Sequence, residues 1–208
     1  MAVQQVRPGE FFISELGRII RITDMRQDDF YGSTDFAGVS ALTAGTNGKP
    51  FDSITDQGKH HTNLTTARRI PGRNRFNVLR VGVHIAQAWG NTLVSGDDIM
   101  KLAHAASLKF SINTRLVTEG PLLKYQSGYG VTGSTVQNNR AALTIGLASQ
   151  ASAPRFIAAQ PLNDEDDLDC VITTDANGWL DTTALPTLDT DAVMTTYLHG
   201  IIEKPITT

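Results

Sequence analysis

The sequence predicts a mainly β protein, an antiparallel β-sandwich of jelly-roll type with one short α-helix and long loops or arms. Short apolar stretches alternate with polar residues at a period of two, turn-forming clusters separate them, and one stretch repeats at helical spacing. A chain of 208 residues with 40% hydrophobic content is long enough for one such domain and can supply its core. These features fit a sandwich or jelly roll better than a βαβ fold.

The N-terminal third of the chain is expected to contain little regular structure. Residues 1–10 have no periodic apolar face and are predicted to form an arm. Residues 11–23 favour β structure and are broken near Gly17, which predicts one strand or two short ones. Residues 24–75 are rich in turn formers, which indicates a long functional loop or an inter-subunit arm. A single domain is therefore expected over residues 11–208, with this loop or arm inside it.

The central part of the chain contains the clearest strand and the one expected helix. Apolar residues alternate with Arg, Gly and His over residues 76–85, which predicts a strand with one apolar face. Acidic residues suited to a helix start precede an apolar pattern at helical spacing, which predicts a helix over residues 97–106. Period two then returns at once, and residues 107–117 are expected to form one strand.

The C-terminal half repeats short strands and turns. Alternating or apolar stretches predict strands near residues 143–147, 155–159, 170–174 and 193–202. The pair Asn177-Gly178 is the best hairpin signal in the chain, because type I′ turns favour these residue types.

The amino-acid composition limits the kinds of molecule that this protein is expected to contact. The net charge of −3 argues against attraction of the whole surface to nucleic acid. A charged fraction of only 19% is typical of a protein whose surface is partly covered by neighbours. The N-terminus lacks a secretory signal and no segment approaches a membrane span, so synthesis in a cytoplasm is expected.

Two charged segments are candidate contact sites. The acidic residues 163–169 are expected to form a solvated loop or, in an assembly, to face the basic stretch of a neighbouring subunit. They match a calcium loop only weakly, since the glycine and the terminal glutamate are missing. The basic stretch could instead contact lipid or nucleic-acid phosphates beneath a shell. Its arginines are Arg68, Arg69, Arg73 and Arg75.

Patterns for catalysis or metal binding are not found, and neither an enzyme nor a cofactor is expected. The chain has no phosphate loop, nucleophile elbow or dinucleotide fingerprint. Cys170 lies in an apolar stretch and is expected to be a buried, inert thiol. The histidines have no familiar zinc spacing and are expected to be exposed loop residues or hydrogen-bonded strand residues. They are His60, His61, His84, His104 and His199.

The order of segments over residues 76–208 carries a family resemblance. It consists of an apolar strand, the helix DDIMKLAHAA, the strand LKFSIN, the segment EGPLLKY with a Gly-rich turn, and a closing strand ending in LHGIIEKPI. This order resembles the jelly-roll capsid (coat) proteins of tailless icosahedral bacteriophages, some of which enclose a membrane. The resemblance implies an eight-stranded sandwich whose copies tile a shell as trimers or pseudo-hexamers. It also implies a location in the virion, after synthesis in a host cytoplasm, in contact with other virion proteins.

On this resemblance, the chain is expected to be a self-assembling subunit of a phage capsid shell. Aromatic, arginine and acidic residues of its arms and loops are the expected inter-subunit contacts. These candidates are Phe30, Tyr31, Phe36, Arg68, Arg69, Arg73, Asp166 and Asp167.

Two other classes of function stay open. A phage spike, tail-fibre or receptor-binding module would form a compact trimer without higher assembly. A jelly-roll sugar-binding or cupin-like enzyme would be a monomer or dimer with a concave site that holds converging polar groups.

Overall fold

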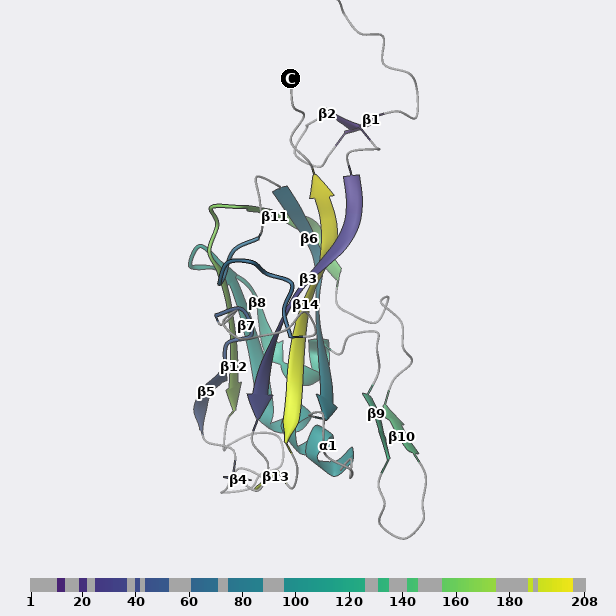
Figure 1. Ribbon diagram of the computed structural model, residues 1–208, viewed down its shortest axis with the longest axis vertical. Coiled ribbons are helices and arrows are strands. Elements are labelled where there is room, and N and C mark those ends of the chain that lie inside the picture. Colours follow the sequence, from purple (N-terminus) through teal and green to yellow (C-terminus); the bar gives the residue numbers. More distant parts are fainter. Residues whose placement is uncertain are drawn as a thin grey trace, which may run out of the picture.

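Over the residues that it describes, the computed structural model shows a mainly β protein with antiparallel sheets and one short α-helix (Figure 1). Every strand pairing in the described part of the chain is antiparallel. The structure describes residues 11–13, 19–21, 25–36, 40–41, 44–52, 61–70, 75–87, 96–125, 131–134, 142–145, 155–174, 187–188 and 191–203.

The first four-stranded sheet has the order β11-β6-β14-β3. Its central strand, β14, pairs with β6 on one side and with β3 along its whole length on the other. Met194 and Leu198 of β14 are fully buried, because every second side chain of a strand points to the same face. The strands are β3 (Met25–Phe36), β6 (Arg75–Gln87), β11 (Arg155–Asn163) and β14 (Ala192–Glu203).

The second four-stranded sheet has the order β5-β12-β7-β8. Strand β12 alternates strictly between buried and half-buried side chains, as expected for a strand with one face on the core. The strands are β5 (Gly45–Gly48), β7 (Ala106–Ile112), β8 (Arg115–Pro121) and β12 (Leu168–Thr174).

Shorter elements lie around these two sheets. In Figure 1, α1 (Gly96–Ala105) lies at the lower end of the molecule, and β1 (Phe11–Ile13) and β2 (Ile19–Arg21) lie at the upper end. No described helix has the length and apolar character that spanning a lipid bilayer requires. The remaining elements are β4 (Ser40–Ala41), η2 (Leu122–Tyr125), β9 (Val131–Ser134), β10 (Ala142–Ile145) and β13 (Thr187–Leu188).

One hydrophobic cluster contains side chains from both four-stranded sheets. Phe76 and Leu198 belong to the first sheet, and Phe110 and Ile172 belong to the second. All four side chains are fully buried. Burial of apolar area in a shared core is the main favourable contribution to folding, so each sheet depends on the other for its stability.

Two glycines allow the sheets to approach each other closely at one edge. A Cβ atom added at Gly32 of β3 would lie 2.1 Å from the carbonyl oxygen of Pro50, just after β5. A Cβ atom added at Gly48 of β5 would lie 2.6 Å from Cγ2 of Thr34 on β3. Any side chain at either glycine would therefore push β3 and β5 apart.

Several predicted elements are confirmed by the structure. The helix expected over residues 97–106 is α1 (Gly96–Ala105), and the strands expected over residues 76–85 and 193–202 are β6 and β14. Residues 11–23 contain the two short strands β1 and β2. The expected arm over residues 1–10 and the Asn177-Gly178 turn lie outside the described residues.

The prediction of a loop or arm throughout residues 24–75 is wrong for β3 and β5. Strand β3 is 12 residues long and lies at the edge of the first sheet. An edge strand needs few apolar side chains, and β3 directs Phe30 and Phe36 into the core while most of its other residues are polar. Its sequence therefore lacks the alternation that identifies a strand.

The strand expected over residues 107–117 is interrupted by a two-residue turn. Asn113 and Thr114 have φ values of 49° and 68°, and they connect β7 to β8 as a hairpin. Positive φ at both central residues is the geometry of a type I′ turn. The Asn113 N–H donates to the Asp167 carbonyl oxygen at 3.0 Å, so a contact distant in sequence supports this turn.

Candidate functional site

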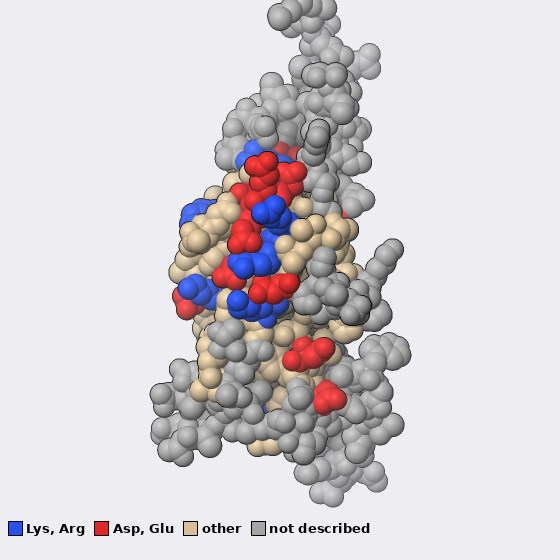
Figure 2. Space-filling view, turned by 60° about the vertical axis from the view of Figure 1, so that its left-hand side comes forward, with Lys and Arg blue, Asp and Glu red and all other residues tan. Residues whose placement is uncertain are grey.

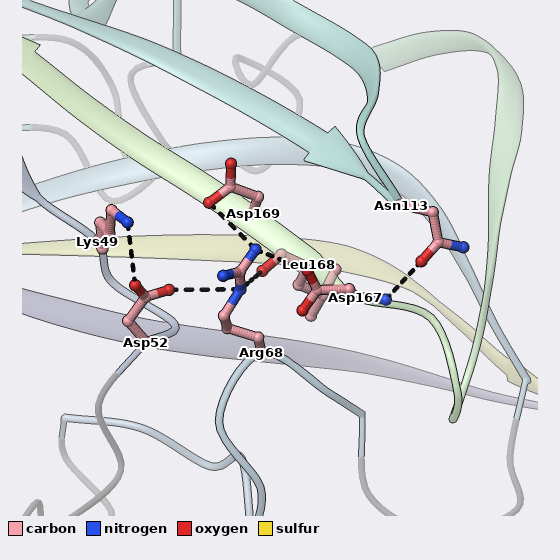
Figure 3. A network of polar contacts seen from close by, with 7 residues as sticks. All are labelled: Lys49, Asp52, Arg68, Asn113, Asp167, Leu168 and Asp169. Atoms are coloured by element: carbon pink, nitrogen blue, oxygen red, sulfur yellow. Dashed lines mark hydrogen bonds and ion pairs between the residues drawn. The ribbon is translucent and has the colours of Figure 1, made fainter.

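Arg68 connects three segments of the chain through its backbone and its side chain (Figure 3). Its N–H donates to the Phe51 carbonyl oxygen at 2.8 Å, and its own carbonyl oxygen accepts from the Leu168 N–H at 2.8 Å. Its Nε donates to the Leu168 carbonyl oxygen at 3.0 Å. The φ of Arg68 is 61°, a left-handed conformation that is costly for a residue other than glycine. These contacts hold the backbone in that conformation.

The guanidinium of Arg68 lies among three carboxylates. Its Nη2 is 2.7 Å from Oδ2 of Asp167 and 3.5 Å from Oδ1 of Asp169. Its Nε is 3.6 Å from Oδ1 of Asp52, whose Oδ2 is 3.4 Å from Nζ of Lys49. The partners are about one third to one half exposed, so solvent weakens each ion pair. The network therefore depends on the arrangement of three carboxylates around the one guanidinium of Arg68.

This network changes the interpretation of the two charged segments. The sequence predicts a solvated acidic loop or, in an assembly, a loop that faces the arginines of a neighbour, but Asp167 pairs with Arg68 of its own chain. The reason is tertiary: the Arg68 carbonyl oxygen accepts the Leu168 N–H, which places residues 61–70 beside the start of β12. With its donors directed to carboxylates, Arg68 is poorly placed to bind a phosphate. Contact of the basic stretch with lipid or nucleic acid stays a prediction, in which Arg69 is exposed, Arg75 is half-buried and Arg73 lies outside the described residues.

Asp166 stabilises the turn between β11 and β12. Its Oδ2 accepts from the backbone N–H of Asn163 at 2.7 Å and from Nδ2 of Asn163 at 3.0 Å, and its Oδ1 accepts from Asn113. Partial burial alone would raise the pKa of Asp166, but these hydrogen bonds and the charge of Arg75 outweigh it and lower the pKa. Asp166 therefore acts within its own chain as a turn residue.

The two phenylalanines among the contact candidates belong to the core. Phe30 and Phe36 are 4% and 5% exposed, and the Phe30 ring meets the Phe76 ring edge-on at 4.8 Å. Burial within one chain leaves little of either ring for a second subunit. Arg73 lies outside the described residues.

Tyr31 lies in a row of rings on the face of the first sheet opposite the core. Its ring centroid is 5.7 Å from that of Tyr197, which stacks on His199 at 5.9 Å with an interplanar angle of 7°. Nδ1 of His199 is 2.8 Å from Oδ1 of Asp29. The expectation that His199 is a hydrogen-bonded strand residue is confirmed. This row gives Tyr31 a role within the sheet, and its contact with a second subunit stays a prediction.

The described residues offer little for metal binding or nucleophilic chemistry. Within the described part of the chain, no three His, Cys, Asp or Glu side chains are grouped so that they could hold a metal ion. His60 falls outside it. Cys170 is buried, as expected, and its burial raises the pKa of the thiol to about 12. The thiolate, which is the reactive form, is therefore scarce at neutral pH.

Charged side chains gather in a strip on the side of the molecule where β12 and β5 lie. Figure 2 shows positive and negative groups next to each other along this strip, with uncharged residues over much of the rest of the described surface in that view. The Arg68 network belongs to β12 and to the residues around β5. Neighbouring charges of opposite sign largely cancel at a distance, so this face presents no extended field of one sign.

Two exposed hydrophobic residues could not be identified from the sequence. Leu116 of β8 and Ile157 of β11 are 50% and 106% exposed, although both fall in stretches that were expected to be ordinary strands. An apolar residue in a short strand is usually assigned to the core, and no local signal marks these two as exceptions.

A search against models of known protein families finds no match to this chain, and a search of curated proteins finds none either.

Proposed function

We propose that this chain is a self-assembling subunit of a virion shell, most closely a phage capsid, built on a jelly-roll β-sandwich. The observation that carries the proposal is the strand order. Numbered along the chain, the eight strands of the two four-stranded sheets (β3, β5, β6, β7, β8, β11, β12, β14) have the orders 1-8-3-6 and 2-7-4-5. These orders match those expected of a jelly roll, in which two Greek keys share two sheets, and so they support this part of the proposal.

The packing also supports a sandwich. Side chains from both sheets form one buried cluster. Gly32 of the first sheet lies against Pro50, just beyond the second sheet, and Gly48 of the second sheet lies against Thr34 of the first. Face-to-face packing of two sheets with a shared core is the defining feature of a sandwich.

A jelly roll by itself does not decide the function, because capsid proteins, lectins and cupins share it. Two features favour the shell subunit. The chain has only 19% charged residues, as expected where neighbours cover part of the surface. The edge strands β8 and β11 each expose one large hydrophobic side chain, and in an assembly a neighbouring subunit would cover such edges.

Assembly in solution tests the proposal. The mass of the purified protein is measured by light scattering over a range of protein and salt concentrations, with negative-stain imaging of any large species. Shells, sheets or capsomer-sized rings are expected. A monomer or dimer under every condition would contradict the proposal, and a compact trimer that never grows larger would favour the spike or receptor-binding module.

A further inference from the structure

Strand β3 lies at one edge of the first sheet. The order β11-β6-β14-β3 gives it a single neighbour, and all 12 of its residues, Met25–Phe36, are in register with β14. The backbone groups on its other side have no strand to pair with in that sheet. A long edge of this kind is a ready template for a strand of another molecule.

The chain covers the middle of this edge with two of its own residues. The Tyr31 N–H donates to Oδ1 of Asn63 at 3.0 Å, and Nδ2 of Asn63 donates to the Asp29 carbonyl oxygen at 2.7 Å. Oγ1 of Thr62 donates to the Tyr31 carbonyl oxygen at 2.9 Å. The Asn63 N–H also donates to this oxygen, at 3.4 Å. We name Thr62 and Asn63 the edge guard.

The edge guard reproduces the hydrogen bonds of a neighbouring strand. In a hydrogen-bonded antiparallel pair, each residue accepts the N–H of the residue opposite and donates its own N–H to that residue's carbonyl oxygen. Asn63 does both toward Tyr31, with its side-chain oxygen and its backbone N–H. A segment that is not itself a strand therefore supplies the hydrogen bonds that a strand would supply.

Contacts beyond Asn63 hold the guard in place. Leu64 is 6% exposed and belongs to the hydrophobic core, and its N–H donates to Oγ1 of Thr62 at 3.1 Å. Further along the segment, the backbone and the side chain of Arg68 are hydrogen-bonded to Leu168 of β12. The segment is therefore anchored independently of β3. Substitutions in the guard should open the edge while the rest of the segment stays bound.

Strand β3 of a second copy matches the edge that the guard covers. The N–H and the carbonyl oxygen of Tyr31 both point to the side away from β14. Two copies related by a twofold axis at Tyr31 would therefore exchange two hydrogen bonds between these two residues. Such a contact uses one edge of each copy, so it closes with two chains.

The side chains of β3 also suit this register. With Tyr31 at the centre, positions equally far before and after it face each other. Asp29 of one copy then faces Ser33 of the other, and Asp28 faces Thr34. The two Tyr31 rings meet as a cross-strand aromatic pair, which stabilises strand pairing. A register in which Asp28 faced Asp29 would oppose like charges, which is unfavourable.

We propose that Thr62 and Asn63 prevent β3 of one copy from pairing with β3 of a second copy in antiparallel register about Tyr31. This inference goes beyond the proposed function, because it holds whether or not the chain builds a shell. In a shell subunit, the closed edge would restrict contacts between copies to other surfaces.

Opening the edge is the first step of the test. Thr62→Val keeps the shape of the side chain but removes its hydroxyl, and Asn63→Ala removes both side-chain hydrogen bonds. The double variant is the open-edge protein, and Thr65→Ala, at an exposed position of the same segment, is its control. Circular dichroism and urea unfolding check that each protein is folded. If the double variant does not fold, Asn63→Ala alone takes its place.

Disulfide trapping then measures the pairing and its register. Tyr31→Cys brings the thiols of two paired copies within reach, since opposed residues of a hydrogen-bonded pair have Cα atoms about 5.5 Å apart. Asp35→Cys is the register control, because its two copies would lie eight residues apart along the strands, about 27 Å. Cys170 is buried in every variant's parent fold and is not expected to react.

The outcomes decide the inference. In the open-edge protein, Tyr31→Cys copies should link under mild oxidation at least tenfold faster than Asp35→Cys copies. They should also link at least tenfold faster than Tyr31→Cys copies that keep the guard or carry Thr65→Ala. Equal rates at positions 31 and 35 would show that β3 does not pair about Tyr31.

Equal rates with and without the guard would show that Thr62 and Asn63 do not block the edge. Either result overturns the inference. Neither bears on the proposed function, because the mass of the parent protein in solution tests that separately.

Discussion

Nη2 of Arg68 donates to Oδ2 of Asp167 at 2.7 Å, although 99 positions separate the two residues in the sequence. This contact lets the acidic and basic segments neutralise each other within one chain. Charged groups of these two segments therefore already have partners of opposite charge within the same chain. The large hydrophobic side chains that the described surface exposes, Leu116 and Ile157, lie on other strands, β8 and β11.

Arg68 is expected to be a stability determinant through both its side chain and its backbone. Arg68→Ala removes the donor to the Leu168 carbonyl oxygen and leaves three carboxylates close together, which should cost about 1–3 kcal/mol of unfolding free energy. Arg68→Gly loses the same side chain but suits a φ of 61°, so it should be more stable than the Ala variant by roughly 1 kcal/mol. Urea unfolding of both variants measures the difference. An Ala variant as stable as the Gly variant would contradict the role of the backbone.

The close approach of β3 and β5 is expected to couple Gly48 to Thr34. Gly48→Ala would bring its Cβ to 2.6 Å from Cγ2 of Thr34, which should cost roughly 1–3 kcal/mol through overpacking. Thr34→Ala removes that atom, so the double variant should lose less stability than the two single variants together, by at least about 0.5 kcal/mol. A double-mutant cycle from urea unfolding measures this coupling. Additive effects would mean that the two strands do not meet at these residues.

Cys170 is expected to be unreactive in the folded protein. Burial removes access to the sulfur and raises the pKa of the thiol to about 12, so reaction with a disulfide reagent at pH 8 should be at least about a hundredfold slower than in urea. The control is a Thr65→Cys, Cys170→Ala variant, whose exposed thiol should react promptly in the folded state. Fast labelling of native Cys170 would contradict its placement in the core.

Asp166 is expected to contribute stability that acid removes. Its pKa is lower in the folded chain than the ordinary value of 3.8, so its contribution is present above that value and is lost as pH falls through the folded pKa. Asp166→Asn should therefore be less stable than the parent at pH 7, and the difference should shrink below about pH 4. Urea midpoints at several pH values measure it, with Glu165→Gln on the same turn as control. A difference that is constant with pH would contradict the assignment.

Elements with one apolar face could be predicted from the sequence. In β6 and β14 the alternation of side chains follows from one face packing on the core, and in α1 the apolar spacing follows from the helical period. These patterns can be recognised from neighbouring residues, because the spacing of core-facing side chains follows from the geometry of the strand or helix itself. The turn between Asn113 and Thr114 could not be predicted in the same way, since its positive φ values are supported by Asp167, far along the chain.

The candidate inter-subunit contacts also depend on residues that are distant in the chain, so the sequence did not predict their surroundings. The sequence predicted that Phe30, Arg68 and Asp167 contact a second subunit. The register of β3 against β14 buries Phe30, and residues 61–70 bring Arg68 to Asp167 of the same chain. Ile157 was overlooked, because its exposure results from the unequal pairing of β11 with β6.

The mainly β class, the short helix α1 and the strands whose apolar faces repeat every second residue can all be predicted from the order of the residues. The three-dimensional packing sets which strands are neighbours, which polar segment is an edge strand, which charges pair and which apolar side chains remain outside. Alternation and helical spacing are properties of neighbouring residues, whereas register, edge position and ion pairing depend on residues distant in the chain. Arg68 with Asp167, and Ile157 on its bulge, are both of the second kind.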